Sequence, residues 1–337
     1  MAGFVEARLV NEPFSDPGVF LDVRFGRRAI LFDLGDVAAL SAREILRVGD
    51  VFVSHLHMDH FAGFDRLLRL NLYQERCLRI VGPPGLVRGV EAKLAAYSWN
   101  LLGPHSADFS ILALDWDGAG FRAAGVFRAR DAFRRRDTPF PDLPPGILLD
   151  EPEFTVEAAV LDHGIPCLGF GLQERLRVNV HRARLDEMGL APGPWLTQAK
   201  RAVRAGFGPE TRFEAAPGRT MSLGVLREAG VLHVGPGQRV AYVTDMAASA
   251  ANLDAAARLA AGADLFFVEA GFLPDDEALA RAKHHMTAAD AGALARRAGV
   301  RRAIPFHFSA RYLEREADVR AAFEAAFAGH GKGAAPK

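Results

Sequence analysis

The sequence has almost no cysteine and no net charge. Cys77 and Cys167 are its two cysteines, far apart among 337 residues and in no CxxC pattern. This excludes a disulfide framework and a thiolate zinc site, and it suits a reducing compartment. We expect both cysteines to be small buried side chains. Basic and acidic residues balance at 41 each, so nucleic acid or membrane binding would need a local patch.

Long hydrophobic runs are also missing. No stretch approaches the roughly 18 apolar residues of a membrane-spanning helix. The N-terminal sequence MAGFVEARLV has an acid and a base where a signal peptide needs an apolar core. We therefore expect a cytoplasmic protein without membrane contact. Half of the residues are hydrophobic, so the chain can bury a large core, as one large domain or two of ordinary size.

Short apolar runs of strand type alternate with helical patterns. Residues 18–36 predict a hairpin, DVFVS predicts a third strand, and residues 63–73 predict a helix with one apolar face. Three more strand-type runs follow near the C-terminus: RVAYVTDM, ADLFFVEAG and VRRAIPFHF. Between the last two, a helix is predicted to begin after Thr287 and to stop at Gly299.

Two segments interrupt this pattern. Residues 117–153 contain the arginine-rich FRARDAFRRRD and the proline-rich TPFPDLPPG, which predict an exposed excursion from the core. Residues 174–237 are rich in Arg, Gly and Pro around PGPW. We expect a single domain over residues 1–328 with insertions near these two segments, and a flexible tail at 329–337.

Metal-competent side chains follow four separate strand-type runs. HLHMDH at 55–60 follows the first, and His163, Asp245 and His307 follow the others. In a layered α/β structure these strand ends can converge, and imidazole and carboxylate groups are ligands that first-row metals accept. A lone histidine at a strand end is more often structural, whereas HxHxDH is far more specific. The set fits two metal ions, which together hold a hydroxide nucleophile and stabilise developing charge.

These motifs resemble the metallo-β-lactamase superfamily, whose hallmark is HxHxDH, and within it the ribonuclease Z family. The likeness runs from about residue 19 to about residue 313 and includes LFDLGD, VGPPGL, LDHGIPCLGFGLQE, LDEMGLAPGPWLTQAK, VEAGF, HHMTAADAGALA and IPFHFSARY. It implies an α/β fold of four layers, an αββα sandwich with the site at one edge between the sheets. It also implies a metal-dependent endoribonuclease that removes 3′ trailers from precursor tRNA with a metal-bridging hydroxide.

The resemblance implies a role for each motif residue. The first ion would be bound by His55, His57 and His163, the second by Asp59, His60 and His307, and both by a bridging Asp245. Asp33 would orient a ligand histidine. Asp59 would also hold or accept the proton of the nucleophile. His285 would stabilise the transition state or protonate the leaving 3′ oxygen, with Glu269 keeping its imidazole charged. Two zinc ions are expected, although these ligands also accept manganese or iron.

Four motifs depart from the family's pattern. This sequence has VTDM where the family has GDT, DLGD where it has DCGEG, and HHMT where it has HST, and VEAG lacks the histidine of HEAT. All ligands survive, so the changes bear on the substrate and on groups behind the ligands. A small-molecule hydrolase acting on a cyclic nucleotide, another phosphodiester, a sulfate ester or a lactone is the alternative; a closed apolar pocket would favour it, and an extended basic surface would favour RNA. His57 disfavours the diiron redox branch, which has Glu there, and the intact ligands disfavour a scaffold protein without turnover.

Two basic segments are candidates for RNA contact. The first is a run of arginines with Phe127 and Phe133 interleaved: Arg128, Arg130, Arg134, Arg135 and Arg136. Its alternative is a solvated charged face. The second resembles the family's tRNA-contacting arm, with Trp195 as a stacking face and Lys200 as a cation; its alternative is an ordinary helix packed on the core by Trp195 and Val203. Because family members are usually dimers, we expect a homodimer that acts on precursor tRNA or a small phosphodiester.

Overall fold

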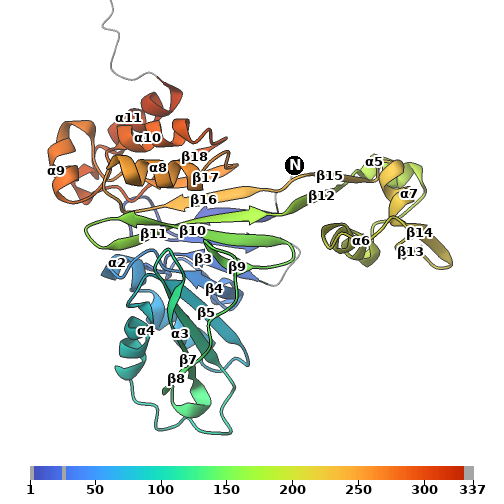
Figure 1. Ribbon diagram of the computed structural model, residues 1–337, viewed down its shortest axis with the longest axis horizontal. Coiled ribbons are helices and arrows are strands. Elements are labelled where there is room, and N and C mark those ends of the chain that lie inside the picture. Colours follow the sequence, from blue (N-terminus) through green and yellow to red (C-terminus); the bar gives the residue numbers. More distant parts are fainter. Residues whose placement is uncertain (1–3, 25–27, 330–337) are drawn as a thin grey trace, which may run out of the picture.

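Two β-sheets lie face to face in the computed structural model, which describes residues 4–24 and 28–329 (Figure 1). The first sheet contains, in this order, β1 (Val5–Leu9), β2 (Val19–Val23), β3 (Ala29–Phe32), β4 (Val48–Phe52), β5 (Cys77–Gly82), β6 (Ser110–Trp116), β7 (Phe121–Arg128) and β8 (Arg135–Asp137). The second contains β18 (Ala303–Phe306), β17 (Leu265–Glu269), β16 (Arg239–Val243), β11 (Pro166–Glu174), β10 (Phe154–Asp162) and β9 (Ile147–Asp150).

Aromatic rings fill the space between the sheets. Phe32 and Phe52 from the first sheet meet Phe170 from the second, with ring centroids 5.3 and 5.7 Å apart. Tyr242 on β16 also packs against Phe32, at 5.9 Å. Alternate residues of a strand point to opposite faces, so these strands use one set of side chains between the sheets and the other set against helices.

Helices cover the two outer faces and complete the αββα sandwich. The first sheet is covered by α1 (Ala42–Ile45), α2 (Met58–Phe61), α3 (Phe64–Asn71) and α4 (Leu86–Ala95). The second is covered by α8 (Ala250–Leu259), α9 (Glu277–Ala282), α10 (Ala288–Arg297) and α11 (Glu316–Ala328). Short 3₁₀ turns lie at Ala129–Asp131, Pro274–Asp276 and Ala310–Tyr312. The four-layer fold predicted from the sequence is therefore confirmed.

The local signals at the two ends of the chain are also confirmed. β2 and β3 pair antiparallel, with Val19 opposite Phe32, and β4 adds in parallel beside β3. Thr287 caps α10: its side-chain oxygen accepts from the backbone N–H of Asp290, and the carboxylate of Asp290 accepts from the backbone N–H of Thr287. Gly299 follows the helix at φ +65°, the left-handed conformation that ends helices.

The predicted excursion at residues 117–153 is wrong for β9 at Ile147–Asp150, which pairs with β10 in the second sheet, and for residues 121–137. There β7 pairs along its length with β6, and β8 pairs with β7. Phe127 and Phe133, which the sequence offered as RNA contacts, are buried in the core of the first sheet. An exposed connection remains at residues 138–146.

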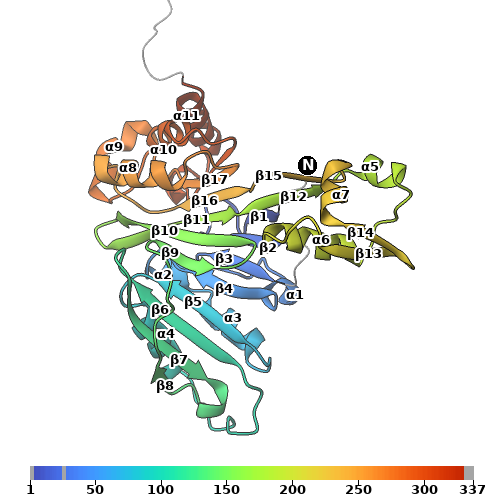
Figure 2. The same cartoon turned by 45° about the vertical axis from the view of Figure 1, so that its right-hand side comes forward.

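The second irregular segment forms an arm, residues 176–236, that projects from the sandwich (Figures 1 and 2). Its stalk is the antiparallel pair β12 (Leu176–Val180) and β15 (Leu232–Pro236). Its head contains α5 (Arg182–Glu187), α6 (Pro194–Arg204), α7 (Leu223–Glu228) and the hairpin of β13 (Arg212–Ala216) and β14 (Arg219–Ser222). The head packs around its own apolar cluster. At the root, a Cβ on Gly237 would lie 1.7 Å from the carbonyl oxygen of Glu174, so only glycine lets the two ends of the arm approach so closely.

Three further expectations concern single positions. Cys167 on β11 is buried as expected, but Cys77 is exposed; it is the first residue of β5, where a strand reaches the end of the sheet. No helix within the described ranges is long and apolar enough to cross a membrane. The predicted tail lies outside the described residues from position 330 onward.

Candidate metal centre

Four strands of the two sheets deliver their metal-competent residues to one place. After β4 the chain reaches His55, and α2 then carries Asp59 and His60. His163, Asp245 and His307 follow β10, β16 and β18. Two groups of ligand atoms, each within 4.8 Å internally, hold the predicted ligands: His55, His57, His163 and Asp245 form one, and Asp59, His60 and His307 form the other. A third group of the same kind consists of Asp245, Glu269 and His285. All seven residues singled out in the sequence as ligands are thus brought together.

Asp245 lies between the two groups. Its Oδ2 is 3.7, 3.5 and 3.4 Å from the Nε2 atoms of His55, His60 and His163. Its Oδ1 is 3.1 Å from Nε2 of His307. Oδ2 thus lies near histidines of both groups and Oδ1 near His307, so this one carboxylate reaches both groups, as a bridging ligand must.

The environment of His60 fits a metal ligand. Its ring is fully buried, and Nδ1 lies 2.8 Å from Oδ2 of Asp33. Its Nε2 is buried too but has no hydrogen-bond partner among the described residues. Because buried polar atoms are nearly always satisfied, a cation among these imidazoles and carboxylates would complete the site. The donor set of histidines and aspartates suits zinc, manganese or iron.

Behind the ligands, hydrogen bonds fix the histidine rings. Asp33 has φ +61°, and it accepts from the backbone N–H of Ser54 at 2.6 Å and from its hydroxyl at 2.7 Å. The N–H at Nδ1 of His60 donates to the same carboxylate, and that at Nδ1 of His163 donates to the carbonyl oxygen of His284 at 2.8 Å. Both bonds leave the Nε2 lone pair toward the centre, as metal binding requires.

Burial sets the charge states around the centre. It lowers the pKa of His55 to about 2, with the neighbouring His60 adding to the effect, so His55 is neutral and able to bind metal. Burial alone would raise the pKa of Asp245, but His307 and His60, when protonated, hold it well below its ordinary value by charge and hydrogen bonding. Asp245 is therefore an anion.

Glu269 holds His285 beside the metal ligands. Glu269 is completely buried; its Oε1 accepts from the backbone N–H groups of Met246 at 2.9 Å and Met286 at 3.2 Å. Its Oε2 lies 2.8 Å from Nδ1 of His285. Burial lowers the pKa of His285, but the charge and hydrogen bond of Glu269 outweigh it and raise the pKa to about 9. The His285 ring, 4.7 Å from that of His163, is therefore a charged proton donor at the centre's edge.

A small cavity opens next to this pair. It has a volume of about 280 Å³ and is lined by His285, His307 and Ser309, with Lys283 and Arg311 as its cations. Phenylalanine and leucine side chains form the rest of its wall. The space beside the centre is thus basic and partly apolar.

The arginine run of the sequence is largely engaged in ion pairs. Arg128 pairs with Asp108, Arg135 lies 2.8 Å from Asp137, and Arg136 lies 2.9 Å from Asp131. Arg130 donates to the carbonyl of Ser106 and also lies near Asp108. These contacts are what a solvated charged face shows, and RNA contact by this run, Arg134 included, stays a prediction.

Trp195 does not offer a stacking face. It is 6% exposed and packs in the arm's apolar cluster with Val203, while its indole N–H donates to the carbonyl of Ala191. The amphipathic face of α6 turns the tryptophan inward, so the prediction that it stacks on RNA is wrong.

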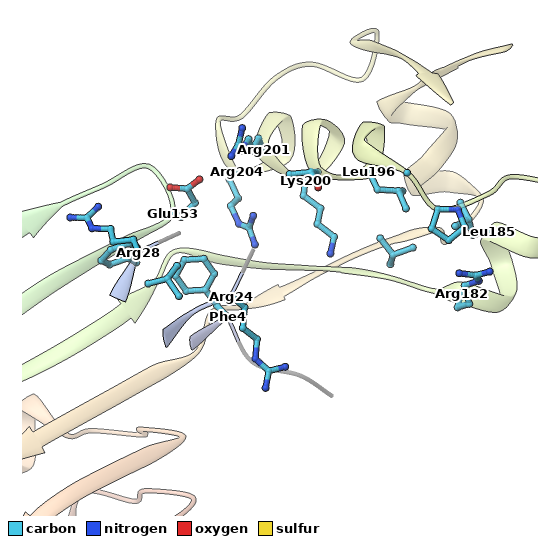
Figure 3. A pocket seen from close by; sticks show the side chains of 16 residues that line it. Phe4, Arg24, Arg28, Glu153, Arg182, Leu185, Leu196, Lys200, Arg201 and Arg204 are labelled. Carbon is cyan, nitrogen blue, oxygen red and sulfur yellow. The ribbon is translucent and has the colours of Figure 1, made fainter. Parts of the chain in front are cut away.

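Lys200 lies on the opposite face of α6. It lines a cavity of about 460 Å³ between the arm and the body of the protein, where apolar side chains such as Phe4 are surrounded by cations (Figure 3). These cations are Arg24, Arg28, Arg182, Lys200, Arg201 and Arg204, and Glu153 is the acid in the lining. The basic character predicted for this segment is thus present, but on a concave surface.

Several residues at the centre escaped the sequence analysis. Ser54 binds Asp33, and the hydroxyl of Tyr242 donates to Oδ2 of the same carboxylate at 2.6 Å. The hydroxyl of Thr244 donates to Oδ1 of Asp245 at 2.8 Å. Their positions in the sequence were the available signal. Ser54 immediately precedes HxHxDH, Tyr242 lies on β16, and Thr244 stands between that strand and Asp245.

The sequence is similar to a β-lactamase superfamily domain and to ribonuclease Z proteins. The model of a β-lactamase superfamily domain matches residues 172–308. The chain is 34% identical to the ribonuclease Z of Deinococcus radiodurans over 328 residues, 96% of this chain and 95% of that protein. It is 31% identical to the ribonuclease Z of Thermobifida fusca over 308 residues, 89% of this chain and 80% of that protein.

Two solved structures share the fold at low sequence identity. The short form of human tRNase Z has a TM-score of 0.52 and 18% identity, and the match covers 90% of this chain and 93% of that chain. A metallo-β-lactamase fold protein from Bacillus subtilis has a TM-score of 0.55 and 14% identity, over 96% and 93%. These likenesses concern the architecture, which is that of the αββα sandwich.

Proposed function

The chain belongs to the ribonuclease Z family of the metallo-β-lactamase superfamily, and from this premise we propose that it is a metal-dependent endoribonuclease removing 3′ trailers from precursor tRNA. The observation that carries the proposal is the position of Asp245, one carboxylate between two groups of ligands. Such a pair of groups suits hydrolysis of a phosphodiester, where charge builds on both the attacking and the leaving oxygen.

The residues would divide between two ions, with zinc as the proposed metal. The first would be held by His55, His57 and His163, the second by Asp59, His60 and His307, and both by Asp245. When bound, two such ions supply a hydroxide nucleophile and neutralise charge on the attacked phosphate.

Two side chains would move protons. Asp59 is a partly exposed ligand, with 42% of its side chain accessible, and its Oδ2 lies 3.6 Å from His60 and 3.8 Å from His307. It would hold or accept the proton of the nucleophile. His285, kept charged by Glu269, would protonate the leaving 3′ oxygen of the RNA, which departs poorly as an anion. The hydrogen bond between Glu269 and His285 would thus assist departure of the leaving group.

For the substrate we propose that the arm contacts RNA through the cavity that Lys200 lines (Figure 3). Backbone phosphates would lie against Lys200 and Arg201 on α6, and the apolar floor would face the sugars and bases. Several of these cations are shared with acids; for example, Arg28 pairs with Asp50 and Glu151, and Arg204 on α6 pairs with Glu174. The contact would therefore be of moderate strength.

Three broader proposals accompany this one. The sandwich and its arm form a single domain; the protein is a homodimer, as its family resemblance implies; and it acts in the cytoplasm. Light scattering coupled to gel filtration tests the dimer, for which a monomer at micromolar concentration is the contrary result.

The test of function is a paired assay on metal-loaded protein. One arm follows cleavage of a precursor tRNA with a 3′ trailer, the other hydrolysis of bis(p-nitrophenyl) phosphate, each beside Asp59→Ala. Cleavage just after the discriminator base, lost in the variant, is the expected result. Turnover of the small diester alone would move the substrate to the small-molecule class, and turnover of neither would contradict hydrolysis.

A further inference from the structure

Tyr242 on strand β16 and Thr244, the residue that follows the strand, turn two buried hydroxyl groups toward the metal centre. Tyr242 and Thr244 alternate along the chain, so they share one face, while Val243 between them packs on the opposite side against the outer helices. Both hydroxyl-bearing side chains are completely buried. The proposed function gives neither of them a role.

Each hydroxyl donates to a different carboxylate. The hydroxyl of Tyr242 donates to Oδ2 of Asp33 at 2.6 Å, and that oxygen also holds Nδ1 of His60. The hydroxyl of Thr244 donates to Oδ1 of Asp245 at 2.8 Å. Oδ1 is the oxygen that faces His307, whereas Oδ2 faces His55, His60 and His163.

The two bonds therefore converge on one ligand group. Tyr242 acts through Asp33 on His60, and Thr244 acts on the oxygen of Asp245 beside His307. His60 and His307 belong to the same group, together with Asp59. Asp245 itself is grouped with His55, His57 and His163, but the oxygen that faces His55 and His163 is Oδ2, not the Oδ1 that Thr244 holds.

We propose that Tyr242 and Thr244 are positioning residues for the second ion, the one held by Asp59, His60 and His307. This inference rests on the proposed two-ion function. The Thr244 hydroxyl fixes the rotation of the Asp245 carboxylate, so that one oxygen stays available to each ion. Without it, the carboxylate is free to turn both oxygens toward the three histidines of the first ion.

Thr244 acts on the shared ligand directly. Its side chain is completely buried, and its hydroxyl has an acceptor in Asp245. It therefore provides a donor to the ligand that both ions would share.

The test is a metal titration that distinguishes the two ions. Metal-free full-length protein, wild type and the variants Thr244→Val, Thr244→Ser and Tyr242→Phe, is titrated with zinc against a chromophoric chelator, and native mass spectrometry counts the ions. We expect wild type and Thr244→Ser to bind two ions. In Thr244→Val and Tyr242→Phe the first affinity should stay within about twofold, and the second should fall about 10-fold or more, the usual size of effects behind a ligand.

Tyr312→Phe is the matched control. It removes another buried tyrosine hydroxyl that donates to an aspartate, Asp276, outside the ligand groups, and it should leave both affinities unchanged. Thermal unfolding of the metal-free variants checks that each is folded. If Thr244→Val does not fold, the second metal affinity of Tyr242→Phe and of Thr244→Ser still tests the inference.

Equal weakening of both ions, an unchanged second affinity, or an equal loss in Thr244→Ser would overturn the inference. A wild-type protein that binds a single ion would instead contradict the two-ion site. The two failures are therefore distinguishable.

Discussion

Glu269 and His285 form a largely buried hydrogen bond of 2.8 Å that links the end of β17 to the segment before α10. Because Glu269 keeps His285 protonated, with a pKa of about 9, RNA cleavage should fall as the pH rises through about 9. In Glu269→Gln, burial still lowers the pKa of His285, but the negative charge of Glu269 that raises it is gone. The loss of RNA cleavage should therefore begin at a lower pH. A profile of kcat/KM for precursor tRNA from pH 6 to 10 measures it. An identical alkaline limb in the variant would contradict the role of Glu269.

Removing the imidazole should separate the two substrates. His285→Ala should lower kcat for precursor tRNA by about 10²-fold to 10⁴-fold, the usual range for a general acid. Hydrolysis of bis(p-nitrophenyl) phosphate should change little, since its leaving group departs as a stable anion. Parallel kinetics on both substrates test this, and equal losses on both would assign His285 to metal binding or folding instead.

Loss of the shared ligand should cost more metal than loss of a ligand from one group. Asp245→Ala should retain less than one ion per chain, and His57→Ala about one. Activity should fall by about 10³-fold in Asp245→Ala, because several kcal/mol of transition-state stabilisation are lost. Plasma emission analysis of dialysed protein measures the metal. Full occupancy in both variants would defeat the ligand assignment.

Metal removal should also destabilise the fold. An ion that binds only the folded state adds about 2.7 kcal/mol at 100 times its dissociation constant, which for a chain of this size is a rise of several degrees in Tm. Calorimetry with and without chelator should show that difference in wild type. Asp245→Ala serves as the control, and its Tm should respond little to the chelator.

The two basic segments should differ in their salt dependence. Lys200→Ala should flatten the plot of log affinity for precursor tRNA against log salt by about 0.7 to 0.9, one phosphate contact. Arg135→Ala and Arg136→Ala should leave the slope unchanged, because both arginines pair with acids. Binding titrations from 50 to 300 mM salt, roughly the range in which such slopes are measured, compare them. A flatter slope only in the arginine variants would reverse the assignment.

The convergence of the candidate ligands was predictable because they follow short apolar strands, and strand ends in a layered sandwich meet at one edge. His55 and His307, about 250 residues apart in the sequence, belong to neighbouring groups for that reason. The sequence pattern did not show which strands pair with one another. Residues 121–137 read as an excursion because arginines dominate the run from 127 to 137, yet side chains such as Phe127 and Phe133 face the core.

Trp195 illustrates a second limit. Its exposure depends on which face of α6 meets the rest of the arm, and the partners of that face, such as Leu223 and Val231, are distant in the sequence. The alanine-rich helices α8 and α11 were missed because small residues give a weak apolar stripe. The roles of Tyr242 and Thr244 depend on hydrogen bonds to side chains of other elements, which spacing alone does not reveal.

The closed root of the arm has an evolutionary consequence. Gly237 touches Glu174, so the chain leaves the sandwich and returns to it at one point, and Gln173 pairs with Arg239 directly across that point. Everything between them can lengthen, shorten or be replaced without shifting the register of β11 against β16 or moving Asp245 at the far end of β16. Substrate preference can therefore diverge in the arm while the hydrolytic chemistry is inherited unchanged.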